Sequence, residues 1–536
     1  MKKIPLLVLS SLLLVGCSQN TSSSFSSAKK ETNILDDNYR NYYEIFVSSF
    51  ADGNNDGIGD LKGITSKLSY LSNIGYTGIW LTPIFTSPSY HKYDVQDHFT
   101  IDSDFGTLDD LKELVQVAHS LNMKVLLDGV FNHSSNLNSW FNSSLLAHRK
   151  KLLGESLTEE EKEYDSLYSY VDSKEEMKSD RKYEKAGAND FYYECNFSSS
   201  MPEFNFESEF TYTKIKAVID YYMSDEIGID GFRLDAVLYY DYHNTEKNVI
   251  ILNRIAKMIH DHDGYVVGEC FADEKTITDY YESDVDSFFY FPAQGNNGFI
   301  VSSIGFQGQN KMKYLENEIR MIKNASSHIP APFLDNHDVS RVSRSGNMRQ
   351  HKFLLGLRDM LNGSTFNYYG DEIGMSSLNL DTNSDYLDSS YRTHYYWDDE
   401  THGYETNDPS HALKQEETYP DSKTQLGDYN SILNYEKKAL KLRNTYPSIA
   451  RGKISVDEDD MKINQDDERT LLLILEKEYQ DEKIKIIFNF SSLESYTYEM
   501  KDYKLEDTLL SDMDDKEKVE SNTLTLPPYS VAILKR

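Results

Sequence analysis

The chain alternates short apolar segments with longer amphipathic segments, and this alternation restricts its fold more than any other feature of the sequence. Residues 64–74 and 108–121 repeat their apolar side chains at helical spacing. The apolar runs between such stretches are as short as buried strands, and they lie at residues 43–47, 78–81, 125–128, 229–234, 265–268, 287–290, 332–334 and 366–369. Eight strands joined by crossover helices predict an α/β fold of the (β/α)8 barrel type.

The spacing of polar residues at the strand ends agrees with this barrel and locates an insertion. A barrel of eight units needs about 30 residues per unit. Asp235 and Glu269 lie 34 residues apart, about one unit, and Glu269 and Asp338 lie 69 apart, about two. Asp128 and Asp235 lie 107 apart, which is too many for one unit. We therefore expect a barrel from residues 39–133 and 206–450, with an inserted domain at residues 134–205.

The C-terminal part of the chain has a different pattern. Residues 471–475, 484–490, 524–526 and 531–534 read as strands without intervening helices, which is typical of an antiparallel sheet or sandwich. We expect residues 451–536 to form a separate β-rich domain.

The N-terminus has the features of a targeting signal. Lys2 and Lys3 precede an apolar stretch at residues 4–15, which is too short to span a bilayer. Residues 14–17 (LVGC) resemble the lipobox of bacterial lipoproteins, which implies that residues 1–16 are a signal peptide and that Cys17 carries lipid. Residues 17–38 then form a flexible tether, and the protein is anchored at the extracellular face of the cell membrane. The alternatives are an ordinary secretory signal or a chance apolar start.

The composition narrows the classes of partner. The chain has 55 Lys and Arg residues against 88 Asp and Glu residues, a net charge of −33, which makes a nucleic-acid partner improbable. Its 40 Tyr residues suit a neutral polar ligand that stacks on rings. Three cysteines exclude a disulfide scaffold, and whether Cys195 and Cys270 pair stays open. We expect a monomer.

Four of the predicted strands end in residues that can do chemistry. In a barrel enzyme the loops at the carboxyl ends of the strands form the site. A single charge there is usually structural, but four matched strand ends are harder to dismiss. They carry Asp128, Asn132 and His133; Arg233 and Asp235; Glu269; and His337 and Asp338. Three carboxylates with Arg and His donors suit cleavage of a glycosidic bond.

The segments around these residues resemble the four conserved regions of the α-amylase family, glycoside hydrolase family 13. They read DGVFNH at 128–133, GFRLDA at 231–236, GE at 268–269 and FLDNHD at 333–338. The resemblance implies that the insertion is that family's domain B and the C-terminal part its domain C. It implies that Asp235 is the nucleophile, Glu269 the acid/base and Asp338 the carboxylate that stabilises the transition state. We expect neighbouring Asp235 and Asp338 to raise the pKa of Glu269.

The same resemblance implies a set of substrate contacts. Arg233 would orient Asp235, while His133 and His337 would hold hydroxyl groups of the sugar in subsite −1. In the segment YHKYD at 90–94, Tyr93 would stack beneath that sugar with His91 beside it. Two positions depart from the common pattern: Glu203 stands in MPEFN at 201–205, and Leu238-Tyr239 replaces the Lys-His pair that often follows the nucleophile.

A Gly- and Asp-rich loop follows the first strand. Residues 52–60 (DGNNDGIGD) place oxygens at every second position, which suits a hard cation, although Gly63 stands where an EF-hand loop has its Glu. The loop resembles the single Ca²⁺ loop of oligo-1,6-glucosidases and related amylase subfamilies. That resemblance implies a structural Ca²⁺ bound by Asp52, Asn54, Asp56, the Ile58 carbonyl and Asp60. The alternative is a turn with solvated charges.

Several activities fit this sequence. We favour an α-amylase that cleaves α-1,4-glucosidic bonds of starch and malto-oligosaccharides with retention. An exo-acting oligo-1,6-glucosidase is the nearest rival, since Asp94 and Arg341 occupy positions where such enzymes pair two charges, although Ala236 stands where they usually have Val. A related α-glucosidase or transglycosylase would use the same intermediate. A non-catalytic sugar-binding lipoprotein would typically lose catalytic carboxylates, and none is lost here.

Overall fold

The computed structural model describes residues 31–305, 310–342, 347–377, 387–398, 419–466 and 470–536. The predicted signal peptide, Cys17 and the first part of the predicted tether lie outside these residues. Among the described helices, none is both long enough and apolar enough to cross a bilayer.

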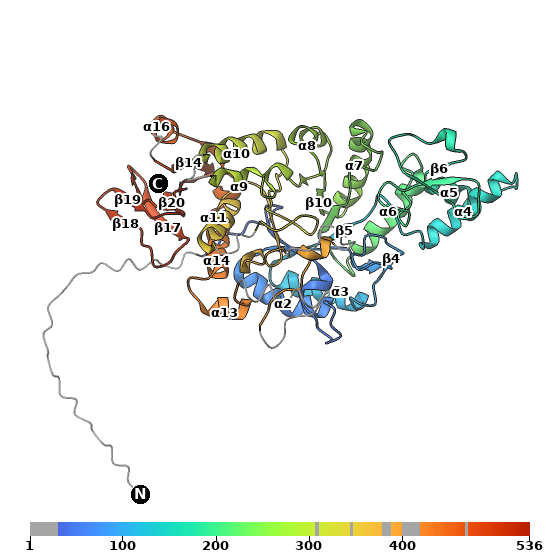
Figure 1. Ribbon diagram of the computed structural model, residues 1–536, viewed down its shortest axis with the longest axis horizontal. Helices are drawn as coiled ribbons and strands as arrows, with labels where there is room; N and C mark the ends of the chain where they lie inside the picture. Colours follow the sequence, from blue (N-terminus) through green and yellow to red (C-terminus); the bar gives the residue numbers. More distant parts are fainter. Residues whose placement is uncertain (1–30, 306–309, 343–346, 378–386, 399–418, 467–469) are drawn as a thin grey trace, which may run out of the picture.

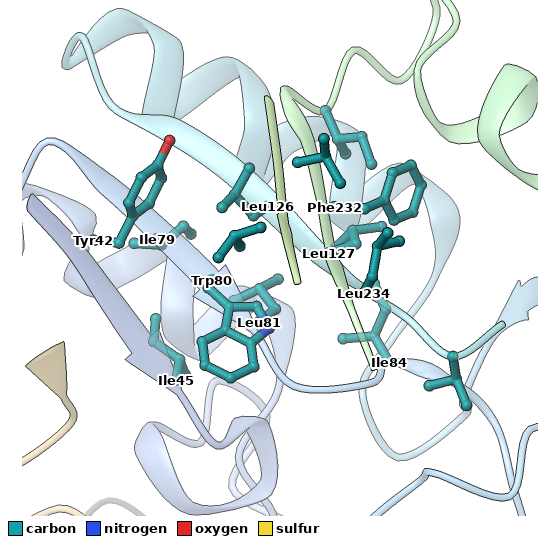
Figure 2. Packing of buried hydrophobic residues seen from close by; sticks show 14 of the residues in the cluster. Tyr42, Ile45, Ile79, Trp80, Leu81, Ile84, Leu126, Leu127, Phe232 and Leu234 are labelled. Carbon is teal, nitrogen blue, oxygen red and sulfur yellow. The ribbon is translucent and has the colours of Figure 1, made fainter. Parts of the chain in front are cut away.

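The chain forms a parallel β-barrel surrounded by helices, as the alternation predicts (Figure 1). Its sheet has the order β11-β10-β9-β5-β2-β1-β12. The strands are β1 (Asn41–Ile45), β2 (Gly78–Leu81), β5 (Lys124–Gly129), β9 (Gly231–Leu234), β10 (Tyr265–Gly268), β11 (Ser287–Phe288) and β12 (Thr365–Tyr368). Figure 2 shows apolar side chains of neighbouring strands, among them Trp80, Leu126 and Phe232, packed against one another. Such burial on both faces is typical of parallel strands.

The strand expected at residues 332–334 is reduced to two isolated parallel bridges. Ala331 pairs with Phe289 on one side, and Phe333 pairs with Phe366 on the other. Pro330 and Pro332 flank Ala331 and have no N–H to donate, so a regular ladder cannot form there. Their carbonyls still accept hydrogen bonds from Ser364 and Phe366, at 2.9 and 3.2 Å, which closes the barrel beside β12.

Helices cover the outside of the barrel. The first long one, α2 (Leu61–Ile74), buries Ile64, Leu68, Leu71 and Ile74, the residues whose spacing predicts it. The others are α1 (Val47–Phe50), α3 (Leu108–Ser120), α6 (Glu209–Tyr222), α7 (Thr245–His260), α8 (Glu274–Tyr280), α9 (Phe299–Ile304), α10 (Lys311–Ala325), α11 (Met348–Asp359), α13 (Ser422–Gly427), α14 (Ile432–Thr445) and α15 (Ser448–Arg451).

Domain B, residues 134–205, follows β5 and projects at one end of the molecule (Figure 1). A short hairpin of β3 (Phe85–Thr86) and β4 (Asp97–Ile101) precedes it in the chain. The domain consists of α4 (Ser139–Leu152), α5 (Glu159–Leu167) and a small antiparallel sheet of β6 (Tyr170–Val171), β7 (Tyr183–Lys185) and β8 (Tyr192–Glu194). Shortly after β5, Asn132 and His133 make backbone pairings with Phe204 and Glu203, so the two ends of domain B meet beside the barrel.

Domain C, residues 451–536, lies at the opposite end of the molecule (Figure 1). It contains two antiparallel sheets, ordered β13-β14-β15-β20-β17 and β16-β19-β18. The strands are β13 (Lys453–Ser455), β14 (Leu472–Tyr479), β15 (Glu482–Asn489), β16 (Tyr496–Glu499), β17 (Lys504–Leu510), β18 (Lys518–Glu520), β19 (Thr523–Leu526) and β20 (Ser530–Lys535). Within residues 470–536 no helix interrupts the four expected strands, as the sequence predicts; the helix α16 (Glu458–Asp466) and the strand β13 before it were not predicted.

The cysteines that the structure describes do not pair. Cys195 in domain B and Cys270 after β10 are free thiols, and both are buried. Burial raises the pKa of Cys195 to about 12, with the charges of neighbouring carboxylates acting in the same direction. Neither thiol is therefore poised to react as a thiolate.

Candidate active site

A cavity of about 480 Å³ opens at the carboxyl ends of the barrel strands and contains the three predicted catalytic carboxylates. It lies between the barrel and domain B, where a (β/α)8 enzyme has its site. Its lining residues are His91, Tyr93, His133, Phe197, Ser198, Met201, Asp235, Ala236, Leu238, Tyr239, Glu269, Phe271, Asp338, Asp388 and Arg392.

Arg233, on β9, joins three carboxylates beneath this cavity. Its guanidinium contacts Asp235 Oδ1 at 2.7 Å, Glu269 Oε2 at 2.9 Å and Asp128 Oδ1 at 2.8 Å. The side chain is buried, and its charge lies near the rings of Trp80 and Tyr93, at 5.1 and 5.7 Å from their centroids. One cation therefore orients the predicted nucleophile and also touches the predicted proton donor.

Glu269 follows β10, and its environment favours the protonated form. Burial, together with the charges of Asp235 and Asp338, raises its pKa to about 8 even though Arg233 acts in the opposite direction. The backbone N–H of Ala236 donates a 2.9 Å hydrogen bond to its Oε2 atom. The expectation that neighbouring carboxylates raise this pKa is confirmed in direction, but burial is the larger cause. At neutral pH this group can donate a proton.

Asp338 has the opposite electrostatic environment. Burial alone would raise its pKa, but His337 and Arg392 hold the pKa of this carboxyl below its usual range. Asp338 Oδ1 lies 3.0 Å from Arg392, and Oδ2 lies 3.2 Å from Nε2 of His337. Glu44, on β1, holds the other ring nitrogen of His337 at 2.6 Å. Despite burial, the charges of Asp338 and Glu44 raise the pKa of His337.

The predicted sugar-binding rings lie together at the floor of the cavity. Tyr93 stacks on His337 with ring centroids 5.5 Å apart and an interplanar angle of 10°, and its hydroxyl donates to Asp128 at 3.0 Å. His133 Nε2 lies 3.1 Å from the Tyr93 carbonyl, and the Tyr93 N–H donates to His91 Nδ1 at 3.1 Å. Burial lowers the pKa of both His91 and His133, so these rings favour their neutral forms.

The structure does not bring Asp94 and Arg341 together as a charge pair. Arg341 pairs with Asp371 at 3.1 Å and lies over the rings of Tyr368 and Tyr369, away from the cavity. Asp94 is buried and accepts hydrogen bonds from Ser87 and Ser89. These two residues, which we predicted as substrate contacts, therefore do not line the cavity.

Arg392 provides the cation that we expected Arg341 to supply. It contacts Asp388 at 2.6 Å and Asp338 at 3.0 Å, it donates to the His337 carbonyl at 2.7 Å, and Asp388 and Arg392 both line the cavity. Sequence reasoning missed this residue because it lies outside the four conserved segments, in a region without a regular pattern. The sequence showed there only an Arg after the last strand of the barrel, with no motif around it that would indicate a substrate contact.

The predicted metal loop forms a compact turn. Asp52 accepts hydrogen bonds from the N–H groups of Asn54, Asn55 and Gly57, while Asp60 caps the N-terminus of α2. Burial raises the pKa of Asp60, and the nearby negative charges of Asp52 and Asp56 raise it further. In the described part of the chain, no three Asp, Glu, His or Cys side chains form a cluster that could hold a metal ion.

Comparison with known proteins decides the family. A family model described as "Alpha amylase, catalytic domain" matches residues 44–452. The chain belongs to the α-amylase family. Its relatives act on glycosidic bonds, and the chain is a glycoside hydrolase by family.

The relatives include proteins of more than one activity. Alpha-amylase 3 of Dictyoglomus thermophilum is 33% identical over 512 residues, which cover 93% of each chain. Oligo-1,6-glucosidase of Bacillus cereus is 26% identical over 571 residues, covering 92% of this chain and 98% of the relative. The solved structure of Eubacterium rectale Amy13B superimposes with a TM-score of 0.83 at 31% identity, covering 95% of this chain and 98% of that one.

Proposed function

We propose that this member of the α-amylase family is a retaining α-amylase that hydrolyses α-1,4-glucosidic bonds in starch and malto-oligosaccharides. Asp235 is the nucleophile, Glu269 the acid/base and Asp338 the carboxylate that stabilises the transition state. His91, Tyr93, His133 and His337 bind the sugar whose bond is cleaved.

The reaction proceeds in two steps. In the first, Glu269 donates its proton to the glycosidic oxygen while an Asp235 oxygen attacks the anomeric carbon, so the leaving sugar departs as an alcohol. In the second, Glu269 takes a proton from water, and that water displaces Asp235 from the anomeric carbon. The product keeps the configuration of the substrate. The negative charge of Asp338 offsets the positive charge that develops on the sugar in both steps.

The opposed pKa shifts at Glu269 and Asp338 carry this proposal. A glycosidase needs one protonated carboxyl group and one ionised carboxylate around the same bond, and different surroundings produce these two states. Here the pKa of Glu269 is raised to about 8, and that of Asp338 is lowered. Arg233 contacts both Asp235 and Glu269, and this shared contact supports their assignment to the same bond.

The charge pair Arg392–Asp388 favours a second candidate, an exo-acting α-glucosidase of the oligo-1,6-glucosidase type. A charged pair that touches Asp338 could bind the hydroxyl groups of a chain end. Transfer to a second sugar would use the same covalent intermediate. The similarity to Alpha-amylase 3 extends over nearly all of both chains at the higher identity, and for that reason we favour the α-amylase activity.

We also propose that residues 52–60 bind a structural Ca²⁺ and that Cys17 anchors the protein to the membrane by lipid. The negative charges of Asp52 and Asp56 near Asp60 support the first proposal, since a bound cation supplies the opposite charge. The residues 1–17 alone support the second.

Product analysis on starch, maltotriose and isomaltose tests the activity. An α-amylase releases short malto-oligosaccharides from starch and leaves isomaltose intact. Cleavage of isomaltose without attack on starch would instead establish the exo-acting candidate. Longer products from maltotriose at high concentration would reveal transfer.

A further inference from the structure

A second cleft, of about 730 Å³, separates domain B from helices α6 and α7 of the barrel, and Arg181 of domain B reaches across it. Its guanidinium donates to both carboxylate oxygens of Glu194, at 2.9 and 3.0 Å, and to Asp241 Oδ1 at 2.7 Å. Glu194 belongs to domain B, whereas Asp241 belongs to the loop that follows β9. This contact therefore connects domain B to the barrel.

At its domain B end, Arg181 is part of a hydrogen-bond chain that leads to the catalytic cavity. The Asn196 side-chain amide donates to Glu194 at 2.9 Å and to Glu203 at 2.8 Å. The turn between Asn196 and Glu203 provides Phe197, Ser198 and Met201 to the cavity lining. A contact that holds Glu194 in place therefore also restrains the turn at residues 196–203, which forms one wall of the cavity.

At its barrel end, Arg181 holds the loop that carries the nucleophile. Asp241 donates its N–H to the Asn248 side chain at 2.7 Å, and Asn248 donates to the Leu238 carbonyl at 3.1 Å. The same loop starts at Asp235 and provides Leu238 and Tyr239 to the cavity. Phe197 and Tyr239 meet from opposite sides, with ring centroids 4.5 Å apart.

These two segments supply apolar residues to the cavity lining, Phe197 and Met201 from domain B and Leu238 and Tyr239 from the loop after β9. His91, Asp338, Asp388 and Arg392 gather where the reacting sugar is bound under the proposed function. The apolar lining, with Leu238, Tyr239 and Phe197, is left for the leaving part of the substrate. Aromatic rings bind the apolar faces of sugars there.

We propose that Arg181 is a positioning residue that fixes the distance between the two apolar walls and so sets how tightly the enzyme binds the substrate beyond the cleaved bond. This inference rests on the proposed function for the direction of the substrate. Nη1 of Arg181 donates to both Glu194 oxygens and Nη2 donates to Asp241, so the two ends of one planar guanidinium serve domain B and the barrel, a geometry that a Lys cannot reproduce.

The variant Asp241→Ala tests this inference, because it cuts the barrel end of the connection and leaves the Arg181–Glu194 pair inside domain B. We expect KM for maltoheptaose to rise about tenfold, the usual size of a coupling through packed side chains. Turnover of 4-nitrophenyl α-maltoside, whose leaving group is a single small ring, should keep its kcat within about twofold.

Asp241→Glu should recover part of the affinity. Arg254→Gln is the matched control, since Arg254 pairs with Glu209 in the same cleft and both residues lie on barrel helices.

Hydrogen exchange provides a readout that needs no turnover. Residues 196–203 and 236–244 should both exchange faster in Asp241→Ala and not in Arg254→Gln. An equal loss of activity on both substrates, or faster exchange in one segment alone, would overturn the inference. If the unaltered protein cleaves neither substrate, the proposed function fails, and the exchange data still decide whether Arg181 holds the two walls together.

Discussion

The surroundings of Glu269 and Asp338 shift the pKa values of these two carboxyl groups in opposite directions. Arg233 touches Asp235 and Glu269 at nearly the same distance, 2.7 and 2.9 Å, yet burial keeps the pKa of Glu269 near 8. The Ala236 N–H, which favours the ionised form, does not overcome this burial.

At this scale we expect Asp235→Asn and Glu269→Gln each to lower kcat on starch by at least a factor of about a thousand, because the first removes the nucleophile and the second the proton donor. Both variants should keep the far-ultraviolet circular dichroism of the parent.

In the parent, kcat/KM should fall as the pH rises through about 8, since Glu269 must be protonated to act. A parent profile that stays flat to pH 9.5 would contradict the role of Glu269.

Glu203 makes a separate prediction about stability. Burial and the charge of Glu194 raise its pKa to about 8, above its value in the unfolded chain. A raised pKa in the folded state gives stability that is complete below about pH 4.5 and lost as the pH rises through about 8. Glu203→Gln should therefore flatten the dependence of Tm on pH between 5 and 8. The exposed Glu175→Gln should not; equal slopes in both variants and the parent would show that Glu203 does not titrate in this range.

Sequence reasoning identified most of the site residues and failed where a charge lies outside a strand end. Asp235, Glu269 and Asp338 meet in one cavity because β9, β10 and the bridged segment at residues 331–333 all end there. Arg341 occupies a position where oligo-1,6-glucosidases pair two charges, which suggested a substrate contact, but it pairs with the buried Asp371 and does not line the cavity. Arg392 reaches Asp338 because the loop after β12 folds back toward the cavity, and the apolar periodicity that predicts strands and helices does not predict the path of such a loop.

At the scale of elements, apolar runs predicted where strands occur better than how they pair. Seven runs became strands of the barrel, while the run at residues 332–334, which contains Pro332 and closely follows Pro330, forms isolated bridges. The short helix α16 was missed because its sequence, EDDMKINQD, is mostly polar and shows no apolar stripe. Burial of Asp460 and Asn464 shows that polar contacts help to hold it against the sheet.

The loop between β1 and α2 carries the prediction at this scale. Ca²⁺ that binds only the folded state would stabilise it by about 2.7 kcal/mol at a hundredfold excess over Kd. EGTA should then lower Tm, and Asp56→Ala should abolish that effect and leave kcat largely intact at low temperature, since the loop does not line the cavity. Titrating Ca²⁺ into the stripped parent and the variant gives the comparison. Equal stabilisation of both would show that the ion binds at another place.

At the scale of the whole molecule, a buried ion pair joins domain C to the barrel. Lys477, on β14, donates to Glu318 of α10 at 2.7 Å and to the carbonyls of Met360 and Ile449 at 2.7 and 2.9 Å. Lys477→Met leaves Glu318 buried without its cation, and we expect a loss of about 3–5 kcal/mol of stability, seen as a lower Tm. The double variant with Glu318→Gln should recover part of it. An unchanged Tm in the single variant would show that the pair does not hold the domains together.

The proposed anchor is tested on the intact chain. Cys17→Ser should move the active protein from the membrane fraction to the soluble fraction, because lipid alone holds it there under this proposal. Activity on starch and membrane content are measured in both fractions after a salt wash. Retention of the variant on the membrane would mean that another part of the chain binds it.

The incomplete strand at residues 330–333 has a consequence for how heat inactivates this enzyme. Asp235 and Glu269 follow strands that are hydrogen-bonded on both sides, whereas Asp338 follows a segment with two isolated bridges. What keeps Asp338 in register is a pair of distant side chains, Glu44 through His337 and Arg392 directly. We expect warming to loosen those two contacts and displace this carboxylate while the other two stay aligned, so that activity is lost, and regained on cooling, at temperatures below the Tm of the barrel.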